Sequence, residues 1–136
     1  MSKATPNSSI NTAAELLKRY AAGQRNFIGV ELSAVNLKET NLRGADLSYA
    51  DLSAADLSLA NLRGVDLSYA SLSAANLEGA DLRGAILLGT DLRGALLEKA
   101  LLKEADYAPS TTHFPDGFDP HQAGMRADGS INLTQP

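Results

Sequence analysis

Six aspartates in the middle of the chain stand at multiples of five residues and could form an array of carboxylates: Asp46, Asp51, Asp56, Asp66, Asp81 and Asp91. A pair of carboxylates can work as general acid and general base. Such a pair needs one site whose surroundings differ from those of its neighbours, and none of the six stands out. The regular spacing instead favours solvation and local turn hydrogen bonds, which Asp side chains form readily.

A second set recurs at intervals of twenty residues and consists of cations: Arg43, Arg63, Arg83 and Lys103. We call it the basic row. Its members, one on each successive coil, are predicted to stack about 5 Å apart on one outer side of the solenoid. Because like charges at that distance repel, nearby acids such as Asp81 and Glu104, or a bound anion, should compensate them. The row is either a solvated face or a binding surface for an acidic partner.

Tyr49 and Tyr69 share the spacing of twenty and are predicted to stack as an exposed aromatic pair. The pair is either simple packing or a protein contact. Together with the basic row, it forms the candidate partner-binding surface.

His113 and His121, with Asp116 and Asp119 between them, are residue types that bind zinc. Their segment has no regular spacing that would bring the ligands together, so we expect no metal site. The chain also lacks a phosphate-binding glycine loop, a nucleophile elbow and a His-Glu-x-x-His motif. We therefore predict no catalytic residues, no cofactor and no enzyme activity.

All of these spacings come from an internal repeat of five residues that runs from about residue 25 to 107. Each unit has a large apolar central residue, a small residue two places earlier, and usually Asp or Asn between them. The predicted core consists of the central residues: Phe27, Leu32, Leu37, Leu42, Leu47, Leu52, Leu57, Leu62, Leu67, Leu72, Leu77, Leu82, Leu87, Leu92, Leu97, Leu102 and Tyr107.

A period of five fits neither an α-helix, with 3.6 residues per turn, nor a β-strand, with two. It fits a chain that turns a corner every five residues and points the central and small residues inward. Residues 40–59 and 60–79 share Leu-Arg-Gly and Leu-Ser-Tyr segments at a spacing of twenty, so each coil should have four sides. About four coils at ~4.8 Å spacing would give an all-β solenoid.

Residues 45–70, ADLSYADLSAADLSLANLRGVDLSYA, closely resemble the pentapeptide-repeat family, cyanobacterial type. The resemblance implies a right-handed quadrilateral β-helix. The segments TAAELLKRYAAGQRNF and THFPDGFDPHQAG also resemble stretches that flank the repeats in cyanobacterial relatives. Some family members protect DNA gyrase by presenting a long acidic rod, which raises DNA mimicry as an alternative function. The short rod, the small net charge and the basic row argue against it.

The segment Thr12-Ala13-Ala14-Glu15 is a predicted capping box that starts a short α-helical cap. An apolar face formed by Ala13, Leu16, Leu17, Tyr20 and Ala21, followed by Gly23, indicates a helix over residues 12–22 lying on the first coil. The predicted organisation is an extended or disordered arm (1–11), a capping helix (12–23), the β-helix (24–107) and an irregular C-terminal tail (108–136).

Ile86, Leu88, Leu96 and Leu101 break the polar pattern and should point outward on the last coil. An outward apolar cluster needs a cover or a partner. We predict that residues 108 to about 125, chiefly Phe114 and Phe118, pack on this coil and shield its open edge. Roughly the last ten residues should be mobile. The alternative is a dimer contact.

The composition sets the remaining expectations. The chain has no cysteine and a formal net charge of −4, which disfavours direct nucleic-acid binding. No apolar stretch is long enough to insert in a membrane. We expect a cytoplasmic protein, a monomer rather than a dimer, that acts as a non-catalytic protein-binding or scaffold module with an unidentified protein partner.

Overall fold

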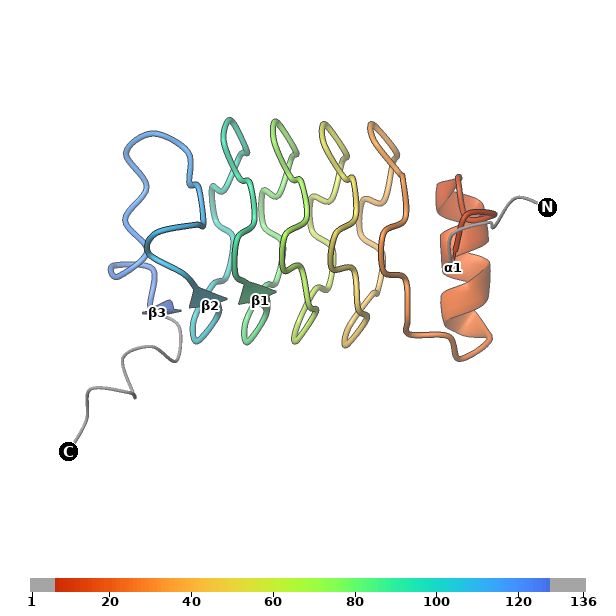
Figure 1. The fold of residues 1–136 in the computed structure, drawn as a ribbon. Coiled ribbons are helices and arrows are strands. Elements are labelled where there is room, and N and C mark those ends of the chain that lie inside the picture. Colours follow the sequence, from red (N-terminus) through yellow and green to blue (C-terminus); the bar gives the residue numbers. More distant parts are fainter. Residues whose placement is uncertain (1–6, 128–136) are drawn as a thin grey trace.

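The computed structural model describes residues 7–127 and shows a stack of coils with a helix at its N-terminal end (Figure 1). From residue 26 to residue 86, the residue before each central residue pairs in parallel with the residue twenty positions later. Successive examples are Asn26 with Asp46, Glu31 with Asp51, Asn36 with Asp56 and Asn41 with Asn61. The pairing register is thus twenty residues and four sides per coil, as the sequence predicts.

Three short strands form a parallel sheet at the C-terminal end of the stack. These are β1 (Ile86–Leu87), β2 (Asp106–Tyr107) and β3 (Arg126–Ala127), in the order β1-β2-β3. Their register again advances by twenty residues, because Ile86 pairs with Asp106 and Asp106 pairs with Arg126. Since β3 lies in the tail, the coil path continues beyond residue 107.

Each corner of the repeat is a tight turn closed by a backbone hydrogen bond. Ala45 N–H donates to the Leu42 carbonyl at 3.0 Å, and Ala50 N–H donates to the Leu47 carbonyl at 3.1 Å. The third residue of each turn has a positive φ, as a type II turn requires. Glycine fills this position in some turns, such as Gly44 (74°), but Ala54 (58°) adopts it too. The scaffold therefore holds ordinary side chains in the left-handed region.

The interior consists of the central residues and the small residues two places before them. Most of the central residues are buried, from Phe27 through Leu92 and again at Leu102. Leu97 and Tyr107 are only half-buried because they lie in the last rungs, against the tail. Full burial of one leucine contributes about 1.5–3 kcal/mol, so the repeat stabilises itself coil by coil.

Helix α1 (Ala13–Ala21) begins and ends near the predicted residues. Thr12 Oγ1 accepts the Glu15 N–H at 3.1 Å, and Gly23, at a φ of 104°, ends the helix. The predicted capping box is only half formed. The Glu15 carboxylate accepts from Arg19 Nε at 2.6 Å instead of reaching back to Thr12, because the arginine one turn later offers a charged donor.

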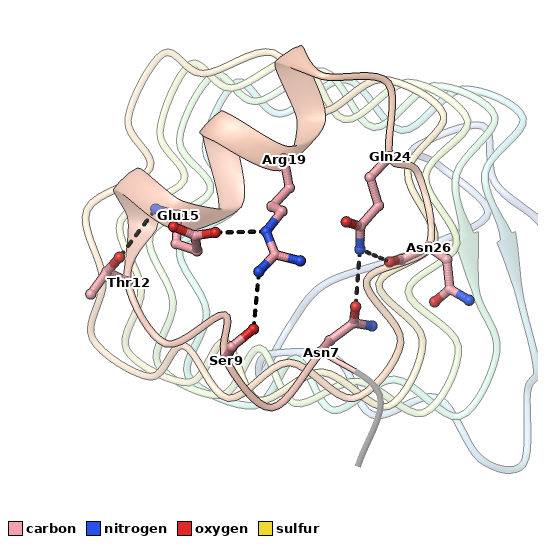
Figure 2. A network of polar contacts seen from close by, with 7 residues as sticks. All are labelled: Asn7, Ser9, Thr12, Glu15, Arg19, Gln24 and Asn26. Carbon is pink, nitrogen blue, oxygen red and sulfur yellow. Dashed lines mark hydrogen bonds and ion pairs between the residues drawn. The ribbon is translucent and has the colours of Figure 1, made fainter. Parts of the chain in front are cut away.

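The arm predicted over residues 1–11 is partly folded. Residues 7–10 form a turn in which Ile10 N–H donates to the Asn7 carbonyl, and the Ile10 side chain is 1% exposed. Arg19 donates to Ser9, and Gln24 donates to Asn7 (Figure 2). The arm is therefore packed where it can be described, and residues 1–6 lie outside the described residues.

This N-terminal segment terminates the edge of the first coil. Elsewhere in the stack, the carbonyls of the equivalent residues accept N–H groups of the preceding coil. The first coil has no preceding coil, and side chains take its place. Asn7 Nδ2 donates to the Ile28 carbonyl, Gln24 Nε2 to the Asn26 carbonyl and the Tyr20 hydroxyl to the Arg43 carbonyl. Unpaired edge groups are thereby satisfied.

The tail follows the path of a further coil and covers the end of the stack. His113 pairs with Asp91, and Arg126 N–H donates to the Ala105 carbonyl at 2.8 Å. Phe114 packs between Tyr107 and Phe118, with ring centroids 5.6 and 5.0 Å apart. The described part of the tail thus lies against the open edge of the last coil.

The prediction that the tail also covers the outward apolar residues is wrong for two of them. Leu96 and Leu101 remain 48% and 47% exposed, whereas Ile86 and Leu88 are half-buried. The reason is that the tail continues along the axis of the stack and leaves its sides open. The expectation of a mobile C-terminus falls largely on residues 128–136, outside the described residues. Between residues 7 and 127, no helix has the length and apolar character needed to cross a membrane.

Candidate functional site

The basic row and the tyrosine pair lie at the two edges of one side of the stack. Arg43 stands in the turn 42–45 and Tyr49 in the turn 47–50, and the extended stretch between them carries Asp46. The next coil repeats this arrangement with Arg63 and Tyr69. We call this surface side A and define it as residues 43–49, 63–69, 83–89 and 103–107. The fold therefore places the two parts of the candidate partner-binding surface, the basic row and the tyrosine pair, at adjacent corners.

The basic row is neutralised unevenly along its length. Arg83 makes a two-pronged contact with Asp81, with Nε–Oδ1 at 2.9 Å and Nη2–Oδ2 at 2.7 Å. That hydrogen-bonded guanidinium lowers the pKa of Asp81, and Asp81 in turn raises the pKa of Arg83. The ion pairs within residues 7–127 do not include Arg43, Arg63 or Lys103.

The cause of this unevenness is the residue that stands two places before each arginine. Asn41 Oδ1 accepts the Arg43 N–H at 3.1 Å, and Asn61 Oδ1 accepts the Arg63 N–H at 3.2 Å. Asp81 makes the same backbone contact with Arg83 at 3.2 Å. Asparagine therefore serves the turn as well as aspartate but gives the arginine no carboxylate within its own turn. The change from Asn at positions 41 and 61 to Asp at position 81 is visible in the sequence and is the signal that distinguishes these arginines.

The surface beside the basic row is open. Residues Arg63, Arg83, Gly84, Lys103 and Glu104 line a shallow depression of about 280 Å³. A Cβ atom built on Gly44, Gly64 or Gly84 would meet nothing within 4 Å. A strip without side chains thus runs next to the row, and a ligand has access to it.

The tyrosine pair forms the other edge of side A. The rings of Tyr49 and Tyr69 stack with centroids 5.2 Å apart at 21° and are 63% and 57% exposed. The Tyr69 ring leans over Gly89, where a Cβ atom would lie 2.5 Å from Cδ1 of the ring. The glycine therefore makes room for the ring, and the stacked geometry predicted from the sequence is found.

The aspartate array serves local turns. The Oδ1 atoms of Asp46, Asp51 and Asp56 each accept the N–H and the hydroxyl of the serine two residues later. The side-chain hydrogen bond from Ser58 lowers the pKa of Asp56. Each carboxylate is thus committed to its own corner.

Candidate metal ligands do not converge in the described part of the chain. Between residues 7 and 127, no three His, Cys, Asp or Glu side chains gather closely enough to hold an ion. His113 lies in the tail beside Asp91, through a backbone pairing. His121 stands in the segment that returns toward β3.

Comparison with known proteins places these features in a family. The family model described as "Pentapeptide repeats" matches residues 26–64 and 60–98, with 8 copies. The solved structure of alr5209, a pentapeptide repeat protein from Nostoc PCC 7120, is 50% identical, with a TM-score of 0.85. The match covers 87% of this chain and 97% of that one. No curated protein matches the chain.

Two other solved structures share less of their length with the chain. HetL, a pentapeptide repeat protein involved in heterocyst differentiation regulation in Nostoc sp. strain PCC 7120, is 36% identical. The match covers 76% of this chain and 56% of HetL, with a TM-score of 0.37. A pentapeptide repeat protein from the Arabidopsis thaliana thylakoid lumen is 32% identical, covering 62% of this chain and 63% of that one, with a TM-score of 0.43.

Proposed function

The chain belongs to the pentapeptide-repeat family, whose members form right-handed quadrilateral β-helices, and we propose that it is a non-catalytic protein-binding module that contacts its partner through side A. The observation that carries this proposal is the exposed Tyr49–Tyr69 stack opposite the arginines of the basic row. Tyrosine and arginine are the residue types that dominate binding energy at protein interfaces.

The rigidity of the scaffold supports the same conclusion. Each rung of side A is fixed by hydrogen bonds to the coils on both sides, as at Leu47 N–H to the Asp66 carbonyl (2.7 Å) and Phe27 N–H to the Asp46 carbonyl (2.8 Å). A backbone held on such a frame loses little conformational entropy when a partner binds. Side A is therefore well suited to contact a folded surface or a peptide.

The absence of an enzymatic role is part of the proposal. The carboxylates of Asp46, Asp51 and Asp56 accept the N–H and the hydroxyl of the serine two residues later. Those of Asp81 and Asp91 accept from the arginine two residues later. General acid–base chemistry needs a proton-transfer group that faces a substrate. Pentapeptide-repeat proteins are generally structural modules, and the repeated use of Asp in this chain fits that role.

Affinity capture from the source cell tests the proposal. Immobilised wild-type protein is compared with the double variant Tyr49→Ser/Tyr69→Ser, and with Leu59→Ser as the matched control. Leu59 is exposed to a similar degree, at 54%, but stands on another side of the stack. We expect a protein that wild type and Leu59→Ser retain and the tyrosine variant loses. Equal retention by all three would contradict the use of side A.

Location, oligomeric state and the alternative function stay predictions. A cytoplasmic location is tested by cell fractionation, and a monomer by light scattering after gel filtration. Leu96 and Leu101, about half exposed, are where a dimer contact would form if the monomer prediction fails. DNA mimicry has no specific support on side A, because the arginines interrupt the acidic surface that a mimic needs.

A further inference from the structure

We propose that the partner presents an acidic peptide segment that lies along the basic row, with Arg43 and Arg63 as its main contacts. The inference rests on the proposed function and specifies the chemistry of the partner. It concerns the edge of side A opposite the tyrosine pair.

The first support is the distribution of charge. The chain carries a formal net charge of −4, yet four cations share the corner that bears the basic row, and the acids of the same units are Asp81 and Glu104. A row of cations on a negative protein attracts acidic segments and orients them toward one surface. An acidic peptide is thus directed to this corner.

The second support is that the arginines are not equivalent. The guanidinium of Arg83 is already held by the Asp81 carboxylate at 2.7 Å. Arg43 and Arg63 follow neutral asparagines, which engage only their backbone N–H groups. Their exposed side chains keep their donors for a ligand, and arginine binds carboxylates through two parallel hydrogen bonds. The N-terminal half of the row is therefore the stronger site.

The third support is geometric. Four rungs at ~4.8 Å give the row a length of about 14 Å. An extended peptide places alternate side chains ~6.8 Å apart, so three carboxylates on one face span about 13.6 Å. The open strip at Gly44, Gly64 and Gly84 leaves room for its backbone.

The neighbouring surface favours a peptide over a nucleic acid. The centre of side A carries Asp46 and Asp66, one coil apart and next to the row. A polyphosphate backbone would meet these carboxylates along its whole length. A short peptide with a few carboxylates can align with the cations and still use the tyrosines beyond.

The test is fluorescence anisotropy at low salt with a labelled nine-residue peptide of alternating Glu and Ser. A Gln/Ser peptide and a single-stranded oligothymidylate of equal length are the comparisons. We expect the Glu/Ser peptide to bind best. The variant Arg43→Glu/Arg63→Glu should lower the affinity for this peptide by at least about tenfold. The matched control Lys38→Glu/Lys99→Glu makes the same charge change at another corner and should have little effect.

A second variant tests the charge of the two arginines without replacing them. Asn41→Asp/Asn61→Asp keeps the Oδ1 acceptor of each turn, so the fold is retained, but it gives both arginines the partner that Arg83 has. We expect this variant to lower the affinity for the Glu/Ser peptide without changing the circular dichroism spectrum or the melting temperature.

Three results would overturn the inference: no binding of the Glu/Ser peptide at millimolar concentration, equal weakening by the row and control variants, or tighter binding of the oligothymidylate. A different outcome is that the Glu/Ser peptide shows no binding while the tyrosine variant, unlike wild type, still fails to retain a protein in the capture experiment. In that case the protein-binding function stands and only the acidic partner is excluded.

Discussion

Replacing Gly89 by alanine tests how the tyrosine pair is held. Gly84 and Gly89 occupy the same position of successive corners, with nearly equal φ angles of 71° and 67°. Their surroundings differ. A Cβ on Gly84 meets nothing within 4 Å, whereas a Cβ on Gly89 lies 2.5 and 2.6 Å from Cδ1 and Cε1 of Tyr69. Gly84→Ala is therefore a matched control for the backbone effect.

The magnitude follows from separating two contributions. Alanine in the left-handed region costs roughly 1–2 kcal/mol. The loss of glycine's freedom in the unfolded chain returns about 0.4–1 kcal/mol. Both variants share this net cost, and Ala34, Ala54 and Ala74 already adopt such angles in the fold. Because the Tyr69 ring is 57% exposed, it can swing away from a new methyl group. Gly89→Ala should then lose the stacking with Tyr49, an additional ~0.5–1.5 kcal/mol.

Urea unfolding followed by far-ultraviolet circular dichroism measures the free energies of unfolding, and near-ultraviolet circular dichroism reports the tyrosine stack. We expect Gly89→Ala to be less stable than Gly84→Ala and to have a weaker tyrosine signal. In a Tyr69→Ala background the difference between the two glycine variants should vanish. Equal stabilities with an unchanged tyrosine signal, or a difference that persists without Tyr69, would refute the reasoning.

Further outcomes can be checked with standard assays. Leu67→Asp places a carboxylate at a site that is 0% exposed and should cost about 3–5 kcal/mol or prevent folding, as seen in thermal melts. Deleting everything after Asp106 should lower the melting temperature and promote end-to-end association in gel filtration. A truncated monomer that melts like the full chain would show that the tail is not a cap. Because the hydrogen bond with Arg83 lowers the pKa of Asp81, its stabilising effect is complete above the ordinary carboxyl pKa and is lost as pH falls through the lowered one. Asp81→Asn should therefore flatten the acid limb of the stability–pH curve. The protein should not inhibit gyrase in a supercoiling assay, and inhibition at sub-micromolar concentration would support DNA mimicry.

The repeat made the coil predictable because its two periods are direct consequences of the geometry. A corner every five residues fixes which residues point inward, and a spacing of twenty fixes which residues stack. The observed pairs, such as Asp46 with Asp66, follow that spacing without an exception until Asp91 pairs with His113. Patterns of this kind are visible in one sequence since every unit repeats the same constraint.

The two ends could not be predicted in the same way. Between Asp106 and His113 the path takes two residues more than the repeat provides, so Asp91 pairs 22 residues on, and β3 returns to the register of twenty at Arg126. No five-residue pattern marks this detour. At the other end, Asn7, Gln24 and Tyr20 donate to carbonyls of the first coil. These carbonyls lack a partner only because no coil precedes the first one, and that is a property of the folded stack rather than of any sequence pattern.

The candidate site contains a position of the repeat at which either Asn or Asp is compatible with the fold. At the position before the central residue, Asn61 and Asp81 each supply an oxygen that accepts a backbone N–H with equal geometry, at 3.2 Å. Folding therefore does not decide between a neutral amide and a carboxylate at these corners. The choice does decide whether the arginine that follows is compensated by its own turn. The charge of the basic row can thus vary without a change in turn geometry, which leaves it available for the binding role proposed above.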